Sequence, residues 1–357
     1  MEINMNKITI EKIKESRIQT IDFNNLPFGK HFSDHMFEMD FADGKWGEPK
    51  IVPFRNLSVH PATSAIHYGQ SIFEGLKAQK AENGDILVFR PDMNAKRLNE
   101  SAKRMSMVEV PEDIFLSGLR ELLELDKDWV SSNPDQSLYI RPFLFATDEY
   151  VGIRPSERYK FLIITSPVGA YYSEPVAVKI ETKYTRAAEG GVGQAKAAGN
   201  YASSLYPAKL AAEEGYRQLL WTDAKTHTYI EEAGTMNVIF VINDTIITPS
   251  EDTDTILKGI TKRSVLEIAK KWGYKVEERP VLVAEIIDAA KNGTLQDAFG
   301  AGTAATIAHI RLIGFEGVNY ELPTIESREF SNRVKNYIED YKLGKIEDEF
   351  NWMMVIS

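Results

Sequence analysis

A glycine-rich stretch near the middle of the chain divides the sequence into two sets of strands and helices. The periodicity of apolar residues is lost in this stretch, Thr185–Gly193. Glycine adopts backbone angles that are closed to other residues, so the stretch is typical of a connection. The chain has 357 residues, more than one hydrophobic core usually serves. We therefore expect two domains, residues 1–172 and 194–357, joined by a linker over 173–193.

Each half of the sequence combines short strands with helices. Asp43-Gly44 and Asn83-Gly84 are turn signals between strands, and Pro91 suits the first turn of a helix. In the N-terminal half we expect strands over 36–41, 50–54, 73–77, 86–89, 137–146 and 159–166, and helices over 91–105 and 112–125. In the C-terminal half we expect strands over 217–222, 228–231, 238–242, 245–248 and 276–280, and helices over 200–215, 261–272 and 283–291. Both halves are thus of the α+β class.

The composition excludes several classes of function. The chain has 42 Lys and Arg against 52 Asp and Glu, and its formal net charge of −10 opposes binding to nucleic acid or to anionic membranes. It has no cysteine, which excludes disulfides, thiolate metal sites and a cysteine nucleophile. Its apolar runs are much shorter than the roughly 20 residues of a membrane span, and its first residues lack the apolar segment of a secretory signal. We expect a soluble, cytoplasmic protein.

Two other kinds of site find little support in the sequence. The six histidines do not follow a metal-ligand spacing, so we expect no metal. The segment Gly300–Ala305 matches the G-x-G-x-x-A dinucleotide fingerprint and raises the alternative of an NAD-dependent oxidoreductase. However, residues 306–313 have the character of a strand, whereas the fingerprint requires a helix there. Too few residues follow for a complete dinucleotide-binding domain.

One lysine lies among small residues directly after the glycine-rich stretch. Lys196 is flanked by glycine and alanine and has no carboxylate nearby in the sequence. A lysine in a desolvated setting loses proton affinity and becomes an amine nucleophile suited to Schiff-base chemistry. The residues alone leave open the alternative of a solvated loop lysine.

Three further patterns suggest a site for an anionic cofactor with a basic ring. Glu231 and Glu232 lie between apolar strands, and one of them facing inward would need a partner such as a pyridinium nitrogen. Gly259 precedes a helix that starts near Thr261, whose free N–H groups could hold a phosphate. Arg90 precedes another helix and could be a second phosphate ligand. Each pattern also has an ordinary alternative. The two acids could lie in a solvated turn, the segment at Thr261 could be a plain helix cap, and Arg90 could be a surface charge.

Together these segments resemble the branched-chain amino acid aminotransferases, fold-type IV pyridoxal-phosphate enzymes, from about residue 28 to 352. The resemblance rests on Gly-Gly-Val-Gly-Gln-Ala-Lys196, Gly199-Asn-Tyr201, Glu232-Ala-Gly-Thr-Met-Asn237, Phe89-Arg90, Gly302-Thr-Ala304, His67-Tyr68, Phe73-Glu-Gly75, Ser137-Leu-Tyr-Ile-Arg-Pro142 and Val168-Gly-Ala-Tyr171. It implies the D-amino acid aminotransferase-like fold, with a smaller N-terminal α/β domain and a larger barrel-like C-terminal domain. It also implies amino-group transfer between L-leucine, L-isoleucine or L-valine and 2-oxoglutarate, which gives branched-chain 2-oxo acids and L-glutamate.

The resemblance also implies roles for individual residues. Lys196 would bind pyridoxal 5'-phosphate covalently and move the substrate's proton, Glu232 would face the ring nitrogen, and Tyr201 would bind the ring's phenolic oxygen. The phosphate would be held by Arg90, by the N–H groups of Ile260 and Thr261, and by the Thr303 hydroxyl. The substrate would be bound by Tyr68, Phe73, Tyr139, Arg141, Tyr171, Thr235, Thr303 and Ala304.

The resemblance further implies a homodimer in which Tyr139 and Arg141 lie on a loop donated across the interface. Arg141 is the only positive charge in the aromatic pocket, so we expect it to bind the γ-carboxylate of glutamate. A D-amino acid aminotransferase or an aminodeoxychorismate lyase of the same fold, and a binding protein without catalysis, stay open as alternatives. The aromatic pocket and the chain length disfavour the first two, and the lysine, acid and tyrosine together disfavour the third.

Overall fold

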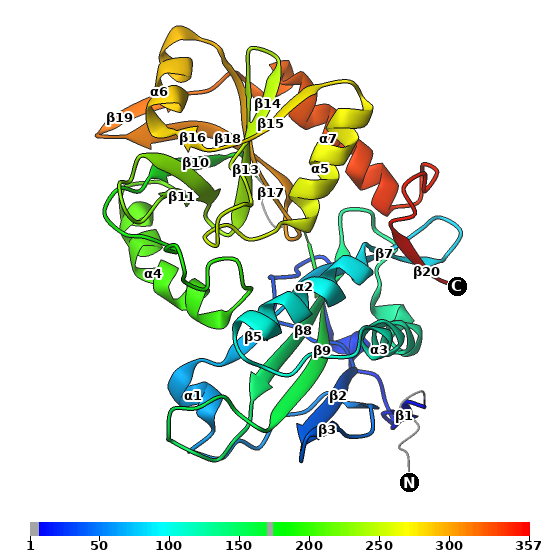
Figure 1. Ribbon diagram of the computed structural model, residues 1–357. Helices are drawn as coiled ribbons and strands as arrows, with labels where there is room; N and C mark the ends of the chain where they lie inside the picture. Colours follow the sequence, from blue (N-terminus) through cyan, green and yellow to red (C-terminus); the bar gives the residue numbers. More distant parts are fainter. Residues whose placement is uncertain (1–6, 170–173) are drawn as a thin grey trace. The chain divides into compact units, whose positions relative to one another are not determined.

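The computed structural model describes residues 7–169 and 174–357 and divides the chain into two compact units (Figure 1). Unit 1 comprises Met1–Tyr171, Ala195–Ala198 and Asp340–Ser357, and unit 2 comprises Tyr172–Gln194 and Gly199–Glu339. The segment around Lys196 and the C-terminus belong to unit 1, which is the longer unit where a smaller N-terminal domain was expected.

Unit 1 is built on a ten-stranded sheet. Its main path is β1 (Thr9–Ile10), β4 (Lys50–Pro53), β2 (His35–Ala42), β9 (Tyr159–Val168), β8 (Ser137–Ala146), β6 (Leu76–Lys80), β7 (Ile86–Phe89) and β20 (Met353–Ile356). Strand β3 (Lys45–Trp46) pairs with β2, and β5 (Ser71–Phe73) pairs with β8. The strand expected over 73–77 is therefore wrong, because Glu74 and Gly75 separate β5 from β6.

Two amphipathic helices, α2 (Pro91–Arg104) and α3 (Glu112–Leu125), supply much of the core of unit 1. Leu98, Phe115 and Leu119 are fully buried in this core. A Cβ on Gly118 would lie 2.5 Å from the ring of Phe37, so only glycine allows α3 to approach β2 this closely. Unit 1 also contains α1 (Ser64–Tyr68), η1 (Ile18–Thr20) and η2 (Lys127–Trp129).

Unit 2 contains a second ten-stranded sheet, part of which closes into a ring. The path is β15 (Lys275–Glu278), β14 (Thr245–Thr248), β13 (Met236–Ile242), β17 (Leu295–Gly302), β18 (Thr306–Phe315), β10 (Val176–Ile180), β11 (Gln218–Thr222), β12 (Tyr229–Ala233) and β16 (Val281–Leu282), with β19 (Val318–Glu321) beside β18. Because β12 also pairs with β13, the strands from β13 to β12 form a barrel. The barrel-like C-terminal fold is thus confirmed.

The helices of unit 2 are α4 (Ala198–Glu213), α5 (Ile260–Lys271), α6 (Val283–Asn292) and α7 (Glu329–Lys342), together with η3 (Ile325–Ser327). Within the described residues, no helix is both long and apolar enough to cross a membrane. The expected linker over 173–193 is wrong in part, because β10 lies inside it and pairs with β11 and β18 as a strand of the barrel. Only the glycine-rich residues after β10 are a connection.

The dinucleotide fingerprint lies in a turn between antiparallel strands. Gly300–Gly302 belongs to β17, and Gly302 pairs with Thr306 at the start of β18. A dinucleotide site of this type needs a strand that leads into a helix, whose N-terminus faces the pyrophosphate. The interpretation of this segment as an oxidoreductase motif is therefore excluded.

A buried histidine in unit 2 predicts a pH dependence of stability. His309 on β18 has a pKa lowered from 6.5 to about 4, first by burial and then by the nearby charges of Lys335 and Arg328. In the unfolded chain this histidine binds a proton near pH 6.5, whereas in the folded protein it does so only near pH 4. The free energy of unfolding should therefore fall as the pH is lowered from about 6.5 to about 4.

His309→Gln should remove up to about 3 kcal/mol of this pH dependence, because glutamine does not titrate. Urea unfolding of the two proteins at a series of pH values measures it. The same substitution at the partly buried His31 is the control and should keep the wild-type slope. Equal slopes for the two variants would show that His309 is not the group responsible.

Candidate functional site

Lys196 is held in the core of unit 1 through its backbone. Its N–H donates to Ser101 Oγ at 3.0 Å, and its carbonyl accepts from the Phe73 N–H at 3.1 Å. Its neighbours Ala195 and Ala197 are buried, and Ala197 pairs with Ile72 in an antiparallel bridge. The small residues around the lysine therefore let the chain enter the core, where two hydrogen bonds fix the position of its Cα.

Three of the residues expected to line the substrate pocket lie together with Lys196. The Lys196 Nζ is 5.0 Å from the ring centre of Phe73, and the Arg141 guanidinium is 4.5 Å from the same ring centre. The Arg141 Nη2 donates to the Tyr139 hydroxyl at 2.8 Å. Arg141 Nε is buried and makes no hydrogen bond within the described part of the chain. The cluster therefore combines aromatic walls with a cation that has unused hydrogen-bonding capacity.

Tyr139 and Arg141 lie on the same face of β8, two residues apart. Strand β8 pairs with β6 and β9 along this part of its length, so these residues lie on a strand and not on a loop as expected. The sequence analysis also missed Phe28, whose ring meets that of Tyr139 edge-on with centres 4.8 Å apart. Tyr68 is on α1 with its ring exposed, and Tyr171 lies outside the described residues.

Arg90 occupies the residue before α2 in an unusual conformation. Its φ of 49° and ψ of 46° place it in the left-handed region, which residues with a side chain seldom adopt. Its backbone N–H donates to the Trp352 carbonyl at 2.7 Å, and its guanidinium carbon lies 4.6 Å from the centre of a Trp352 ring. Trp352 is thus a second residue near the predicted site that sequence reasoning did not identify.

In unit 2, both acids of the Glu231-Glu232 pair are buried. Glu232 Oε1 accepts from the Leu257 N–H at 2.9 Å and from Asn237 Nδ2 at 3.2 Å. Glu232 Oε2 forms an ion pair with Arg186 Nε at 2.9 Å. Burial raises the pKa of Glu231 above its usual range, although Thr255 and Arg186 oppose the shift. The alternative of a solvated turn is therefore wrong for both acids.

Arg186 lies in the glycine-rich stretch that was expected to be only a connection. Besides Glu232, its guanidinium donates to the carbonyls of Thr255 and Gly193. Arg186 therefore attaches the glycine-rich stretch to the barrel and neutralises the buried carboxylate of Glu232. No local signal distinguishes this arginine from a solvated loop residue.

The N-terminus of α5 lies beside this carboxylate. Gly259 is the N-cap residue of α5, so no side chain caps the helix at this position. The first helical residues, Ile260 and Thr261, are buried. A Cβ on Gly259 would lie 1.7 Å from Asn237 Oδ1, so the helix approaches β13 only because this residue is glycine. The N–H groups at this end suit a bound anion.

The strand register gathers the remaining expected residues of unit 2 at one end of the barrel. Asn237 on β13 pairs with both Glu232 on β12 and Ala301 on β17. The turn with Thr235 and the turn with Thr303 and Ala304 therefore lie at the same end as Glu232. Tyr201 lies in the first turn of α4 and is half-buried. Adjacent strands thus place residues together that are far apart in the sequence.

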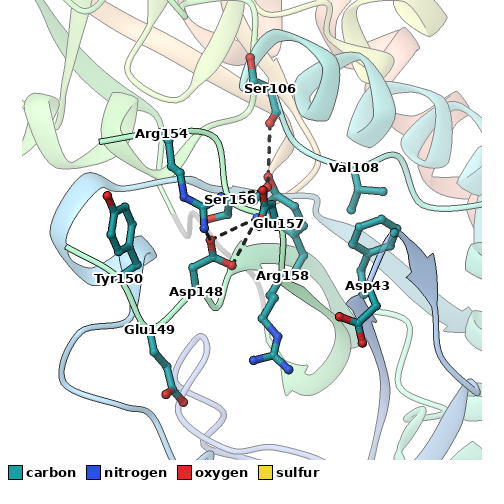
Figure 2. Close-up of a pocket in the computed structure, with 13 residues that line it drawn as sticks. Asp43, Ser106, Val108, Asp148, Glu149, Tyr150, Arg154, Ser156, Glu157 and Arg158 are labelled. Atoms are coloured by element: carbon teal, nitrogen blue, oxygen red, sulfur yellow. Dashed lines mark hydrogen bonds and ion pairs between the residues drawn. The ribbon is translucent and has the colours of Figure 1, made fainter. Parts of the chain in front are cut away.

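A separate cavity of about 750 Å³ lies in unit 1 and contains none of the expected site residues (Figure 2). It is lined by residues around 148–150 and 154–159, the β2–β3 turn, Ser106 and Val108. Arg154 and Asp148 point toward each other there in an ion pair of 3.0 Å. Burial and the charge of Asp148 raise the pKa of Tyr159 to about 12. The contacts fix the base of the loop 149–153.

Comparison with known proteins identifies the family. The model of amino-transferase class IV matches residues 71–313. The chain is 44% identical over 340 residues to branched-chain-amino-acid aminotransferase 2 of Bacillus subtilis (strain 168), covering 94% of this chain and 93% of that protein. The chain belongs to the branched-chain aminotransferases of class IV. It is therefore an enzyme, a transaminase of branched-chain amino acids.

Solved structures of branched-chain aminotransferases share this fold. The Escherichia coli enzyme matches with a TM-score of 0.74 and 26% identity, covering 91% of this chain and 99% of that one. The enzyme from Thermobaculum terrenum in its PLP-form matches with a TM-score of 0.70 and 22% identity, covering 91% of this chain and 98% of that one. The expected fold-type IV architecture is thus confirmed.

Proposed function

We propose that this aminotransferase uses pyridoxal 5'-phosphate to exchange amino groups between L-leucine, L-isoleucine or L-valine and 2-oxoglutarate. The observation that carries the proposal is Lys196, held by two backbone hydrogen bonds beside an aromatic ring and an arginine. Glutamate as the second amino acid is supported by Arg141, which offers a cation to its γ-carboxylate. We place the activity in the cytoplasm, because a chain without cysteine suits a reducing compartment.

The described residues fit the chemical groups of pyridoxal phosphate. Lys196 offers an amine to the aldehyde, and Glu232 offers a buried carboxylate to the ring nitrogen. For the phosphate, the family resemblance assigns Arg90, the N–H groups of Ile260 and Thr261, and the Thr303 hydroxyl. Tyr201 is assigned to the phenolic oxygen. When bound, the cofactor supplies an electron sink for the charge that develops at the substrate Cα.

Residues of the chain would move the substrate's Cα proton and bind the charged groups of the cofactor and substrate. The Lys196 Nζ would take the proton from the substrate Cα as a general base. The buried Glu232 carboxylate accepts two hydrogen bonds and forms an ion pair with Arg186, and it would hold a proton on the ring nitrogen. We assign the substrate α-carboxylate to the backbone N–H groups of Thr303 and Ala304, with Thr235 and Tyr171 completing the substrate contacts.

The aromatic cluster accounts for the two kinds of amino acid that one cycle must accept. Phe73 and Tyr139 offer apolar surface to a branched aliphatic side chain. A γ-carboxylate bound at the same place would cost several kcal/mol if it stayed unpaired. Arg141 can supply the partner, because its Nε is buried without a hydrogen bond in the described residues. With leucine bound, its contact with the Tyr139 hydroxyl satisfies part of its charge.

We further propose a homodimer, with an apolar patch of unit 1 as its interface. The patch comprises Ile66, Tyr68, Val151 and Ile153, which are 65%, 45%, 59% and 89% exposed. The Tyr68 hydroxyl donates to the Val151 carbonyl, so α1 and the loop present one surface. Exposed apolar side chains gathered in this way are typical of an interaction site. This loop, rather than β8, suits the segment that the family resemblance expects to be donated.

The proposed function predicts the outcome of an amino-donor screen. With 2-oxoglutarate as acceptor, the purified protein should use leucine, isoleucine and valine in preference to other amino acids. Borohydride reduction and peptide mapping should place the cofactor on Lys196. Glu232→Gln should lower the rate by orders of magnitude, whereas Glu231→Gln, on the opposite face of β12, is the control and should change it little. A preference for D-amino acids, or an adduct on another lysine, would contradict the proposal.

Arg141→Met should separate the two half-reactions. It should raise KM for glutamate and 2-oxoglutarate roughly ten- to a thousandfold, about 1.4–4 kcal/mol, because the γ-carboxylate loses its partner. The leucine half-reaction should suffer much less. Single-turnover measurements of each half-reaction test this, with Tyr139→Phe as a control that keeps the charge. Equal losses for leucine and glutamate would show that Arg141 only supports the pocket.

Ile153→Asp should weaken the dimer, because a charge would enter an apolar interface. Sedimentation velocity over a range of concentrations should show a wild-type dimer and a dissociating variant. Val318→Asp places the same charge on a residue of unit 2 that is 50% exposed, and it should remain dimeric. A wild-type protein that is monomeric and fully active would contradict the homodimer.

A further inference from the structure

The C-terminal segment is attached to unit 1 next to Arg90. Strand β20 pairs antiparallel with β7, and Met353 is opposite Phe89. Just before it, the Asp348 carboxylate accepts the N–H groups of Trp352 at 2.8 Å and Met353 at 3.0 Å. Residues 348–356, which we call the C-terminal strap, therefore have a fixed path. This path brings Trp352 to the start of α2.

Trp352 contacts Arg90 in two independent ways. Its carbonyl accepts the Arg90 backbone N–H at 2.7 Å, and its ring lies under the guanidinium at 4.6 Å. The first contact is made by the backbone of Arg90 in its left-handed conformation and supports that conformation. The second is a cation–π interaction, in which the guanidinium carbon lies over the indole ring.

The indole is itself immobilised by packing. Trp352 is buried and stacks on Phe350 with ring centres 4.2 Å apart and planes 11° apart. Phe89 and Tyr341 meet it from other sides with centres 5.5 Å away. The ring therefore offers Arg90 a rigid support that a solvent-exposed tryptophan would not.

We propose that the C-terminal strap is part of the cofactor site, with Trp352 as the positioning residue that orients the Arg90 guanidinium toward the phosphate of pyridoxal phosphate. The inference rests on the phosphate role of Arg90 in the proposed function. A cation–π contact engages the charge of the guanidinium, whereas phosphate oxygens bind its N–H donors. A side chain already held in place loses less rotational freedom when the phosphate binds. The strap thereby contributes to cofactor affinity without touching the cofactor.

The test compares the binding of two aldehydes to the apoprotein by equilibrium dialysis. Pyridoxal phosphate carries the phosphate, and pyridoxal lacks it. Trp352→Leu should raise Kd for pyridoxal phosphate about five- to thirtyfold, the range of one cation–π contact, and leave Kd for pyridoxal unchanged. Trp352→Phe keeps an aromatic face and should restore most of the affinity. If Trp352→Leu does not fold, the dissociation constants of Trp352→Phe still test the proposal.

A double-mutant cycle separates positioning from general stability. Arg90→Met should also weaken only pyridoxal phosphate, and adding Trp352→Leu to it should have no further effect. Trp272 is the matched control, because it stacks on Arg333 at 4.0 Å in unit 2. Trp272→Leu should lower the melting temperature of the apoprotein and leave the ratio of the two dissociation constants unchanged.

The failures of the two proposals can be distinguished. If Arg90→Met leaves Kd for pyridoxal phosphate unchanged, the phosphate role of Arg90 in the proposed function is wrong, and this inference falls with it. If Arg90→Met weakens binding while Trp352→Leu does not, only the inference about the strap is overturned. It is equally overturned if Trp352→Leu weakens both aldehydes to the same extent, since that result indicates a structural role alone.

Discussion

A fully buried ion pair fixes helix α2, and α2 positions the predicted site of unit 1. Arg97 binds the Glu74 carboxylate through Nε and Nη2, both at 2.8 Å, and Asn94 adds a bond of 2.7 Å to the same carboxylate. Removing one partner of such a pair costs about 3–5 kcal/mol, because the other charge stays buried. Glu74 follows Phe73 directly, so this contact joins the aromatic wall to α2. The same helix begins after Arg90 and carries Ser101, which receives the Lys196 N–H.

Unit 2 also contains a buried carboxylate, and its charge is balanced by a different set of partners. The buried Glu232 is satisfied by a backbone N–H, an amide and a guanidinium. Asn237 serves both the carboxylate and the Leu257 carbonyl, and it packs against Gly259 at the start of α5. The acid and the helix N-terminus are therefore fixed relative to each other within unit 2, one suited to a cationic ring nitrogen and the other to an anion.

The sequence predicts an element correctly where that element depends on residues close to one another in the chain. Glycine before α5, small residues around Lys196 and the alternation of β8 and β9 each act within a few residues, and the structure contains these elements. The strand expected over 73–77 and the linker over 173–193 were wrong for a different reason. The expected strand over 73–77 is interrupted at Glu74, whose side chain binds Arg97. The expected linker over 173–193 contains β10, which pairs with β11 on one side and with β18 on the other.

The sequence by itself determined the family and the α+β fold, because spaced motifs and periodicity are local properties of a chain, and it supplied the residues that we propose for the site. Only the tertiary structure decided that Arg186 neutralises Glu232, that Trp352 supports Arg90, and that Tyr139 and Arg141 lie on a central strand. It also decided that β12 pairs with β13 to close the barrel and that the C-terminus belongs to unit 1. These contacts join side chains and strands whose meeting depends on packing and on the burial of charge, and no local propensity encodes which distant partner a buried group will find.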